Sequence, residues 1–258
     1  MSINSIKRLQ QLQQTSLADK TIYYKGNIDL LQRPLISIVG SRKPNQYARE
    51  MTHILASKLS QAGVCIVSGG AIGTDIIAHK AAGVDNTIMV AATGLDKRYP
   101  VINKTVIQAI ENKGLVLSQF QEGTPSQKYN FPLRNELIVA LGEILIVPYA
   151  DKNSGTIRSI EYAKKMQKPI FVLPHRLYES LGTNELLAKK EASAIYDIEE
   201  FVQSFAPTPL KEEVDEFLTF CQTNPTYEEA LKKFASRVFE AELQGDIIIK
   251  NGRIYLQN

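Results

Sequence analysis

Short runs of apolar residues alternate with longer amphipathic stretches through most of the chain. The short runs are rich in Val and Ile, which is typical of strands buried on both faces of a parallel sheet. In the longer stretches, apolar residues recur at helical spacing. Strands are predicted at residues 34–40, 64–67, 87–91, 115–118, 144–148 and 169–174, and helices at 45–62, from 75 onward, 102–112, 131–141, 154–167 and 182–190. This alternation predicts an α/β fold with a doubly wound, mainly parallel sheet.

The start of the chain precedes the first clear strand of this pattern. Within residues 1–20, four apolar residues stand at helical spacing among Gln and Lys, which predicts an amphipathic helix. Residues 21–26 predict a short strand or an extended segment. We therefore divide this part of the chain into an N-terminal lead-in helix and strand, residues 1–33, and a main domain, residues 34–205.

The sequence changes character after residue 205. Ala206-Pro-Thr-Pro209 is typical of a linker. Helical stretches follow at 211–223, 226–235 and 236–243, and two apolar runs then flank Asn251-Gly252, a signal for a type I′ hairpin. Three helices followed by a hairpin predict a small winged-helix-like C-terminal domain, residues 210–258.

The composition is that of a globular protein, with 44% hydrophobic and 22% charged residues among 258. The two cysteines, Cys65 in a predicted strand and Cys221 in a predicted helix, are typical of buried free thiols in a reducing compartment. No run approaches the ~18 apolar residues that a membrane helix requires, and the polar start does not resemble a signal peptide. We expect a cytoplasmic protein without a membrane span.

The net charge of +3 is distributed unevenly. Residues 1–181 contain 22 Lys and Arg against 13 Asp and Glu, a net charge of +9, whereas residues 182–258 contain 8 against 14, a net charge of −6. A basic main domain with an acidic tail favours a polyanion bound to the former. The alternative is that these charged side chains only keep the surface hydrated and bind no polyanion.

The turn after the second predicted strand carries the clearest chemical signal. The β-branched run ends in Ser68-Gly69-Gly70, Gly73 follows, and a helix begins near Asp75. A strand, a glycine turn and a helix start present backbone N–H groups and the positive end of a helix dipole to an anion. The spacing satisfies neither the dinucleotide fingerprint nor the Walker A loop, so the glycines alone also fit a simple tight turn.

Positive and aromatic side chains accompany this turn. Gly40-Ser41-Arg42 ends the first predicted strand, and an Arg there suits phosphate as well as a surface turn. Because the ends of parallel strands share one rim, basic residues near them form a candidate track: Arg42, Lys97, Arg98, Lys128, Arg134 and Lys152. Phe131 or Tyr129 is placed to stack on an unpaired base, although Phe131 also fits a core anchor at a helix start.

The sequence gives little support for a metal site or for catalysis. The three histidines, His53, His79 and His175, are far apart and lack metal-ligand spacing. We expect His79 to make a structural hydrogen bond. Ser68 is outside a nucleophile motif, and Asp75 most simply caps or neutralises a helix start.

Five ordered motifs carry a family resemblance: Ile38-Val-Gly-Ser-Arg42, Ser68-Gly-Gly-Ala-Ile-Gly73 with Asp75 and His79, Gly94-Leu-Asp with Tyr99-Pro100, Phe131-Pro-Leu-Arg-Asn135, and Ser154-Gly-Thr156. From about Tyr23 to Leu187 the chain resembles the DNA-processing protein A (DprA/Smf) family. The resemblance implies an extended Rossmann-like core that binds single-stranded DNA, forms a homodimer, protects incoming DNA and helps load RecA in natural transformation. It implies neither catalysis nor a cofactor.

The resemblance also implies a set of residues that contact DNA or phosphate. These are Arg42, Ser68, Gly69, Gly70, Gly73, Lys128, Phe131, Arg134, Asn135, Ser154, Gly155 and Thr156. Duplex DNA should fit less well than a single strand, because stacking on Phe131 requires splayed bases.

The sequence departs from the family pattern at four positions. Glu136 stands where a second Arg is usual, His175 follows Pro174 in place of Gly, Gly70 replaces a Leu, and Ser159 replaces a Thr. Two other functions therefore stay open. One is a phosphoribohydrolase-like enzyme of the related fold, whose catalytic carboxylate would fall at Ser159. The other is a sensor that binds one small nucleotide.

Overall fold

The computed structural model describes residues 2–13, 15–205, 216–244 and 246–256. The chain forms two compact units, Met1–Leu210 and Lys211–Asn258. We call them the main unit and the C-terminal unit and describe each by itself.

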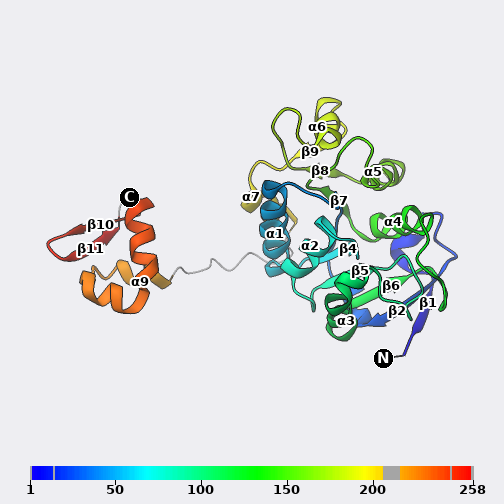
Figure 1. Ribbon diagram of the computed structural model, residues 1–258, viewed down its shortest axis with the longest axis horizontal. Helices are drawn as coiled ribbons and strands as arrows, with labels where there is room; N and C mark the ends of the chain where they lie inside the picture. Colours follow the sequence, from blue (N-terminus) through cyan, green and yellow to red (C-terminus); the bar gives the residue numbers. More distant parts are fainter. Residues whose placement is uncertain (1, 14, 206–215, 245, 257–258) are drawn as a thin grey trace. The chain divides into compact units, whose positions relative to one another are not determined.

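A nine-stranded sheet runs through the main unit in the order β1-β2-β6-β5-β4-β3-β7-β8-β9 (Figure 1). The strands from β3 to β9 are parallel to their neighbours, and β1 and β2 extend the sheet antiparallel beyond β6. The strands are β1 Asn4–Lys7, β2 Thr21–Gly26, β3 Leu35–Ile38, β4 Cys65–Gly69, β5 Thr87–Val90, β6 Leu115–Ser118, β7 Ile144–Val147, β8 Ile170–Val172 and β9 Ser193–Ala194. The predicted mainly parallel, Rossmann-like fold is confirmed.

Helices cover both faces of this sheet. They are α1 Gln46–Gln61, α2 Thr74–Ala82, α3 Lys104–Lys113, α4 Asn130–Leu141, α5 Thr156–Lys165, α6 Leu181–Ala188 and α7 Ile198–Phe205, with short 3₁₀ helices η1 Gln10–Leu12, η2 Ile28–Gln32 and η3 Val101–Asn103. Because successive strand residues point to opposite faces, Ile36 and Ile66 pack with α1, α2 and α7, while Val67 and Leu145 pack with α4 and α5. Two buried apolar layers therefore fix the strand ends rigidly.

The N-terminal segment corrects one prediction. The described residues of the segment 1–20, which are 2–13 and 15–20, do not form an amphipathic helix: β1 pairs antiparallel with β2, with Ile6 opposite Ile22. Leu9 and Leu12 are buried in the core layer under α4. The apolar spacing that suggested a helix therefore arises from an edge strand followed by a 3₁₀ turn, in which the same residues reach the core.

The C-terminal unit contains helices α8 Glu216–Cys221 and α9 Tyr227–Gln244 and the hairpin β10 Ile247–Lys250 with β11 Arg253–Leu256. Phe234 interrupts α9 with non-helical backbone angles, near the boundary between the helices predicted at 226–235 and 236–243, which are present as one kinked element. Asn251 and Gly252 both have positive φ, as the type I′ turn requires. The described residues form helices followed by a hairpin, in the predicted order, whereas the predicted linker at residues 206–209 and the start of the helix predicted at 211–223 lie outside the described residues.

Candidate nucleic-acid interface

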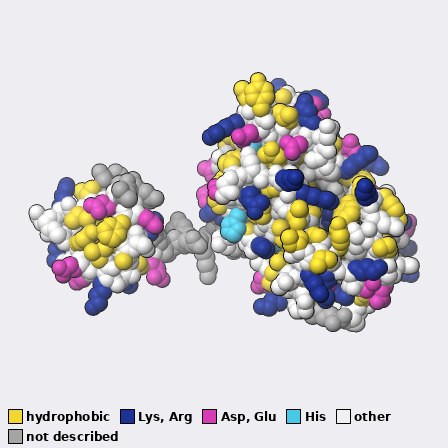
Figure 2. All heavy atoms as spheres, viewed as in Figure 1, with side chains coloured by type: hydrophobic (Ala, Val, Ile, Leu, Met, Phe, Trp, Pro, Cys, Tyr) yellow, Lys and Arg dark blue, Asp and Glu magenta, His cyan; other side chains and the backbone are white. Residues whose placement is uncertain are grey.

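The carboxyl ends of the parallel strands converge on one rim of the main unit. The chain runs outward from β3 through β4, β5 and β6 on one side and through β7, β8 and β9 on the other. The point where this order reverses, between β3 and β7, is where open α/β sheets hold their ligands. Two overlapping cavities open there, with Lys and Arg side chains beside exposed apolar groups (Figure 2).

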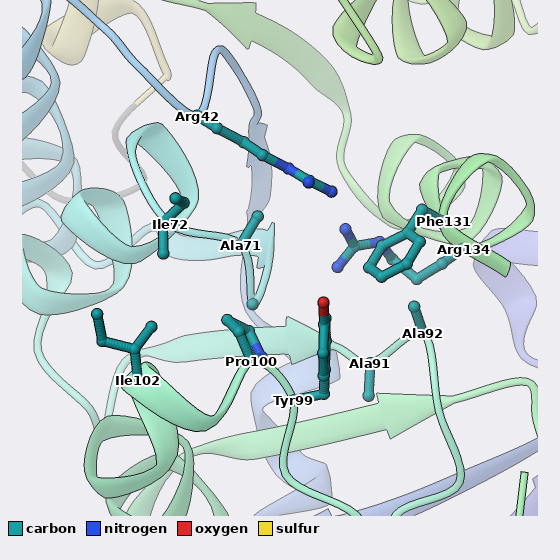
Figure 3. Close-up of a pocket in the computed structure, with 11 residues that line it drawn as sticks. Arg42, Ala71, Ile72, Ala91, Ala92, Tyr99, Pro100, Ile102, Phe131 and Arg134 are labelled. Carbon is teal, nitrogen blue, oxygen red and sulfur yellow. The ribbon is translucent and has the colours of Figure 1, made fainter. Parts of the chain in front are cut away.

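The first cavity, of about 270 Å³, is walled mostly by apolar groups. The Arg42 guanidinium lies 5.4 Å from the centre of the Phe131 ring, and the Tyr99 ring lies 5.8 Å from Phe131. Figure 3 shows Arg42 and Arg134 approaching the cavity from different sides, with the Tyr99 hydroxyl pointing toward both. Two guanidinium groups next to two aromatic rings can hold a phosphate and stack on a base.

The second cavity, of about 730 Å³, extends from this point toward the start of α5. It is lined by the loop after β3, the start of α4 and the segment from Asp151 to Ser159. Its charged lining residues are Arg42, Lys43, Asp75, Lys128, Arg134 and Asp151. Cations outnumber carboxylates in this set, so the groove favours an anionic ligand.

A buried ion pair supports the wall that both cavities share. Arg134 and Asp75 are 6% and 7% exposed, and the Arg134 Nη2 atom lies 4.0 Å from Asp75 Oδ2. Burial raises the pKa of Asp75 against the opposing effect of Arg134, and burial lowers the pKa of Arg134. Arg134 Nη1 also donates to the Val90 carbonyl at 2.7 Å. Asp75 therefore mainly compensates a buried cation. The sequence predicted a simpler role, in which Asp75 caps or neutralises the start of the helix.

The glycine turn is packed closely against this pair. A Cβ at Gly69 would lie 2.2 Å from Arg134 Nη1 and 2.4 Å from Asp75 Oδ2. Gly73 has φ of 84°, and a Cβ there would lie 2.5 Å from the Ser41 carbonyl oxygen. These two glycines thus allow the turn after β4 to contact both the ion pair and the loop after β3.

His79 is fully buried in α2 and bonds to the same turn. Its Nε2 lies 2.8 Å from the Gly69 carbonyl oxygen, and its Nδ1 lies 2.6 Å from Thr87 Oγ1. Burial lowers the pKa of His79 to about 4, so the ring is neutral at neutral pH. The structural hydrogen bond expected for this residue is present.

The start of α5 offers polar groups to the second cavity. Its N-cap residue, Gly155, provides no side-chain cap, and a Cβ there would meet nothing within 4 Å. The buried hydroxyl oxygens of Ser154 and Ser159 have no hydrogen-bond partner. An open helix N-terminus with free hydroxyl groups suits a phosphate.

The structure brings most of the predicted contact residues to one place. The residues that line the cavities are Arg42, Gly70, Lys128, Phe131, Arg134, Asn135, Ser154, Gly155 and Thr156. Ser68, Gly69 and Gly73 are not among the lining residues: Ser68 is fully buried and donates to the Ile38 carbonyl at 2.5 Å. Ser68 and the two glycines support the turn from behind.

The candidate track of basic residues is shorter than the sequence suggested. Arg98 Nη2 lies 2.5 Å from Glu111, Lys152 lies 3.3 Å from Glu185, and Lys97 donates to the Gly123 carbonyl at 2.5 Å. None of these three basic residues lines either cavity. Position near a strand end did not distinguish cations that face the groove from cations paired elsewhere.

Sequence reasoning also missed the apolar walls of the first cavity. Ile72, Ala91, Ala92, Pro100 and Ile102 line it, and Ile102 is 81% exposed. All follow the carboxyl ends of β4 or β5, so the rule that places ligands at such ends is the signal that would have found them.

Two departures from the family pattern lie away from the cavity linings. The Glu136 side chain is 8% exposed and accepts a short hydrogen bond from Ser16 in the N-terminal segment. The His175 ring packs edge-on against Tyr47 and Tyr149 and donates from Nε2 to the Pro148 carbonyl at 2.8 Å. Neither side chain changes the charge of the cavity walls.

Within the described part of the chain, no group of His, Cys, Asp and Glu has the arrangement of a metal site. The same residues include no helix that is long and apolar enough to cross a membrane.

Fold and cavities together define a Rossmann-like α/β protein with a basic, aromatic-edged groove at the switch point of its sheet. The model of the DNA recombination-mediator protein A family matches residues 7–206, and the chain belongs to this family.

Bacterial relatives agree with this assignment. Protein Smf of Synechocystis is 32% identical over 203 residues, which cover 76% of this chain and 51% of that protein. DNA processing protein DprA of Streptococcus pneumoniae is 37% identical over 164 residues, which cover 62% of this chain and 57% of that protein. The chain thus spans about half the length of these curated relatives.

Solved structures agree as well. DNA processing protein A of Helicobacter pylori, described for its single-stranded DNA binding mode, is 40% identical with a TM-score of 0.76; the match covers 79% of this chain and 95% of that one. The X-ray structure of DprA from S. pneumoniae is 31% identical with a TM-score of 0.73; the match covers 80% of this chain and 75% of that one.

Proposed function

We propose that this chain binds single-stranded DNA along the groove at the carboxyl ends of β3, β4, β5 and β7. The observation that carries the proposal is the convergence of Arg42 and Arg134 beside the Phe131 and Tyr99 rings. A backbone phosphate sits between the guanidinium groups, and a neighbouring base stacks on the exposed edge of the aromatic pair. The single-strand binding described for the H. pylori relative supports this assignment.

A duplex is a poorer ligand for the same groove. The first cavity has a volume of about 270 Å³ and apolar walls, so it admits a base only when that base is unpaired and unstacked. We assign the binding to residues 34–205, with residues 1–33 completing the sheet and residues 210–258 forming a separate domain.

Membership of the family supports a proposal for the role in the cell. We propose that the chain acts as a homodimer that protects incoming single strands and helps load RecA onto them in natural transformation and recombination. It does so as a binding protein in the cytoplasm, without catalysis. Sedimentation of the purified chain tests the dimer, and RecA filament formation on covered single strands tests the loading.

Arg42→Ala tests the binding itself. A charge-assisted hydrogen bond contributes about 1.5–3 kcal/mol, so affinity for an oligothymidine falls at least about tenfold at fixed salt. The slope of log affinity against log salt becomes shallower by about 0.7, the value for one phosphate on a single strand. Fluorescence anisotropy with a labelled oligonucleotide measures both quantities.

Arg33→Ala is the matched control, because it removes the same charge at the opposite end of β3, where Arg33 bonds to Asn86. The control should bind as the unsubstituted chain does. Equal affinities for Arg42→Ala and Arg33→Ala, with normal melting curves, would contradict the proposed phosphate contact.

The two other functions give different results in simple assays. A nucleotide sensor would be saturated by a mononucleotide, which would then compete fully with the oligonucleotide at micromolar concentration. A phosphoribohydrolase would release free base from AMP. Ser159 stands at the position of that enzyme's carboxylate, and a hydroxyl group there cannot stabilise an oxocarbenium ion as a carboxylate does.

A further inference from the structure

The position of the groove at the strand ends places backbone carbonyl oxygens close to the proposed anion site. Carboxyl ends of parallel strands present backbone carbonyl oxygens, which are strong acceptors with partial negative charge. A phosphate placed at this rim would be repelled by every carbonyl oxygen left without a donor. The rim therefore favours an anion only if those oxygens are hydrogen-bonded.

In the structure, buried side chains donate to the rim carbonyls around the first cavity. The pairs are Ser68 to Ile38 at 2.5 Å, His79 to Gly69 at 2.8 Å, Asn103 to Gly70 at 3.0 Å, Arg134 to Val90 at 2.7 Å and Asn130 to Ala92 at 3.0 Å. All five donor residues are buried, with exposed fractions between 0% and 8%. Burying five polar side chains costs free energy, which these hydrogen bonds offset.

We infer that His79 and Asn103 are positioning residues for the anion site, which act by neutralising the carbonyl oxygens of Gly69 and Gly70. This inference rests on the proposed function and concerns residues to which that function gives no role. His79 and Asn103 come from different elements, α2 and the end of η3, and meet at consecutive carbonyls of the glycine turn. Gly70 itself lines the first cavity, so the glycine turn that carries both carbonyls borders the proposed anion site.

The protonation state of His79 suits this task. The Gly69 carbonyl can only accept, so Nε2 must carry a proton. In the neutral ring Nδ1 is then an acceptor, and the single proton of the Thr87 hydroxyl lies within reach of both Nδ1, at 2.6 Å, and the Ile66 carbonyl oxygen, at 2.9 Å. The Gly69 carbonyl itself therefore fixes the ring form that covers it, without requiring the ring to be charged.

Asn103→Leu and His79→Leu remove the two donors with little change in size. The expected result is an affinity for oligothymidine about tenfold weaker for each variant. The salt dependence keeps its slope, because no cation is lost. His79→Gln places an amide donor near the position of Nε2 and should restore binding.

A second ligand separates charge from shape. A methylphosphonate analogue of the same oligonucleotide has no backbone charge, so an uncovered carbonyl does not repel it. The ratio of affinities for the phosphodiester over the analogue should fall about tenfold in Asn103→Leu. General damage to the groove would weaken both ligands equally and leave this ratio unchanged, which would overturn the inference.

Ser60→Ala is the matched control. Ser60 donates to the Ala82 carbonyl at 2.5 Å, at the far end of α2, so its loss removes a similar bond away from the rim. The control should melt earlier and bind normally. If His79→Leu does not fold, Asn103→Leu decides alone.

Failure of the inference can be told from failure of the proposed function. If the unsubstituted chain does not bind oligothymidine, the proposed function is wrong. The unsubstituted chain can instead bind, with weaker binding by Arg42→Ala and normal binding by Asn103→Leu. In that case the groove holds DNA, and the hydrogen bonds to the rim carbonyls do not contribute to binding.

Discussion

Residues 1–210 contain 24 Lys and Arg against 18 Asp and Glu, whereas residues 211–258 contain 6 against 9. The main unit buries charged groups at its rim, among them Asp75 and Arg134, and two cavities open beside them. The C-terminal unit has one small apolar core under α8, α9 and the hairpin.

The second half of α9, where a winged helix would read DNA, exposes Phe239, Glu240 and Glu242. The same half of α9 has a single cation, Arg237, which lies 3.5 Å from Glu240, and affinity for DNA comes largely from cations on phosphates. The two units thus differ in charge: cations outnumber carboxylates in the groove of the main unit, whereas the second half of α9 exposes two carboxylates.

The largest expected effect tests the buried charges of the main unit. Arg134→Met leaves the Asp75 carboxylate buried without its cation, which costs about 3–5 kcal/mol of unfolding free energy. Urea unfolding followed by circular dichroism measures this loss.

The double variant Arg134→Met with Asp75→Asn is the control, because it removes both charges and should recover most of the stability. A single variant as stable as the unsubstituted chain would mean that the rim does not depend on the pair, and the contrast between the units would weaken.

The second effect is a loss of folding stability at low pH. All three histidines of the sequence lie in the main unit. The pKa of His79 is about 4 in the folded state against about 6.5 when unfolded, so the unfolded chain binds the proton first as the pH falls. The contribution of neutral His79 is present above pH 6.5 and is lost between about pH 6.5 and 4, up to about 3 kcal/mol.

Urea unfolding of the main unit at pH 7 and pH 4.5, in the unsubstituted chain and in His79→Gln, isolates this contribution. The stability of the His79→Gln variant should fall less on acidification. Parallel pH profiles for both proteins would show that the ring is not held neutral by burial.

The sequence predicted the parallel strands and the rim well because each strand is a continuous apolar run that needs two covered faces, as in Cys65–Gly69 and Ile144–Val147. It failed at the N-terminus, where the short edge strand Asn4–Lys7 has mostly exposed residues and no such run. Pairing to β2 decides its structure, and pairing is a long-range property that local spacing does not report.

The candidate site was predictable to the same extent. Glycines, Arg42 and Phe131 stand in recognisable positions after strands. The sequence could not show which cations line the groove and which are paired elsewhere. Arg98 and Lys152 are neutralised by Glu111 and Glu185, which lie 13 and 33 residues farther along the chain. The donors to the rim carbonyls were equally hidden, since Asn103 and Gly70 meet only in the fold.

The third effect concerns the aromatic part of the groove. Phe131→Ala removes a stacking surface that contributes about 1–3 kcal/mol per base, so affinity for a single strand falls about tenfold to a hundredfold. The slope against salt should not change, because no charge is lost. Phe239→Ala, an exposed Phe of the acidic unit, is the control and should bind normally. Normal binding by Phe131→Ala together with weaker binding by Phe239→Ala would instead place the DNA contact on the C-terminal unit.

The smallest effect comes from deleting residues 207–258. Because the acidic unit carries a net charge of −3 and the proposed groove lies wholly in the main unit, the deletion should change single-strand affinity by less than about twofold. The residual change should be a slight gain at low salt that vanishes near 0.15 M, where the Debye length of about 8 Å screens distant charges. Anisotropy titrations at two salt concentrations, with melting curves of the shortened chain, measure this. A large loss of affinity in a folded main unit would mean that the acidic unit contacts DNA despite its carboxylates, and a gain that persists at high salt would mean that it covers the groove.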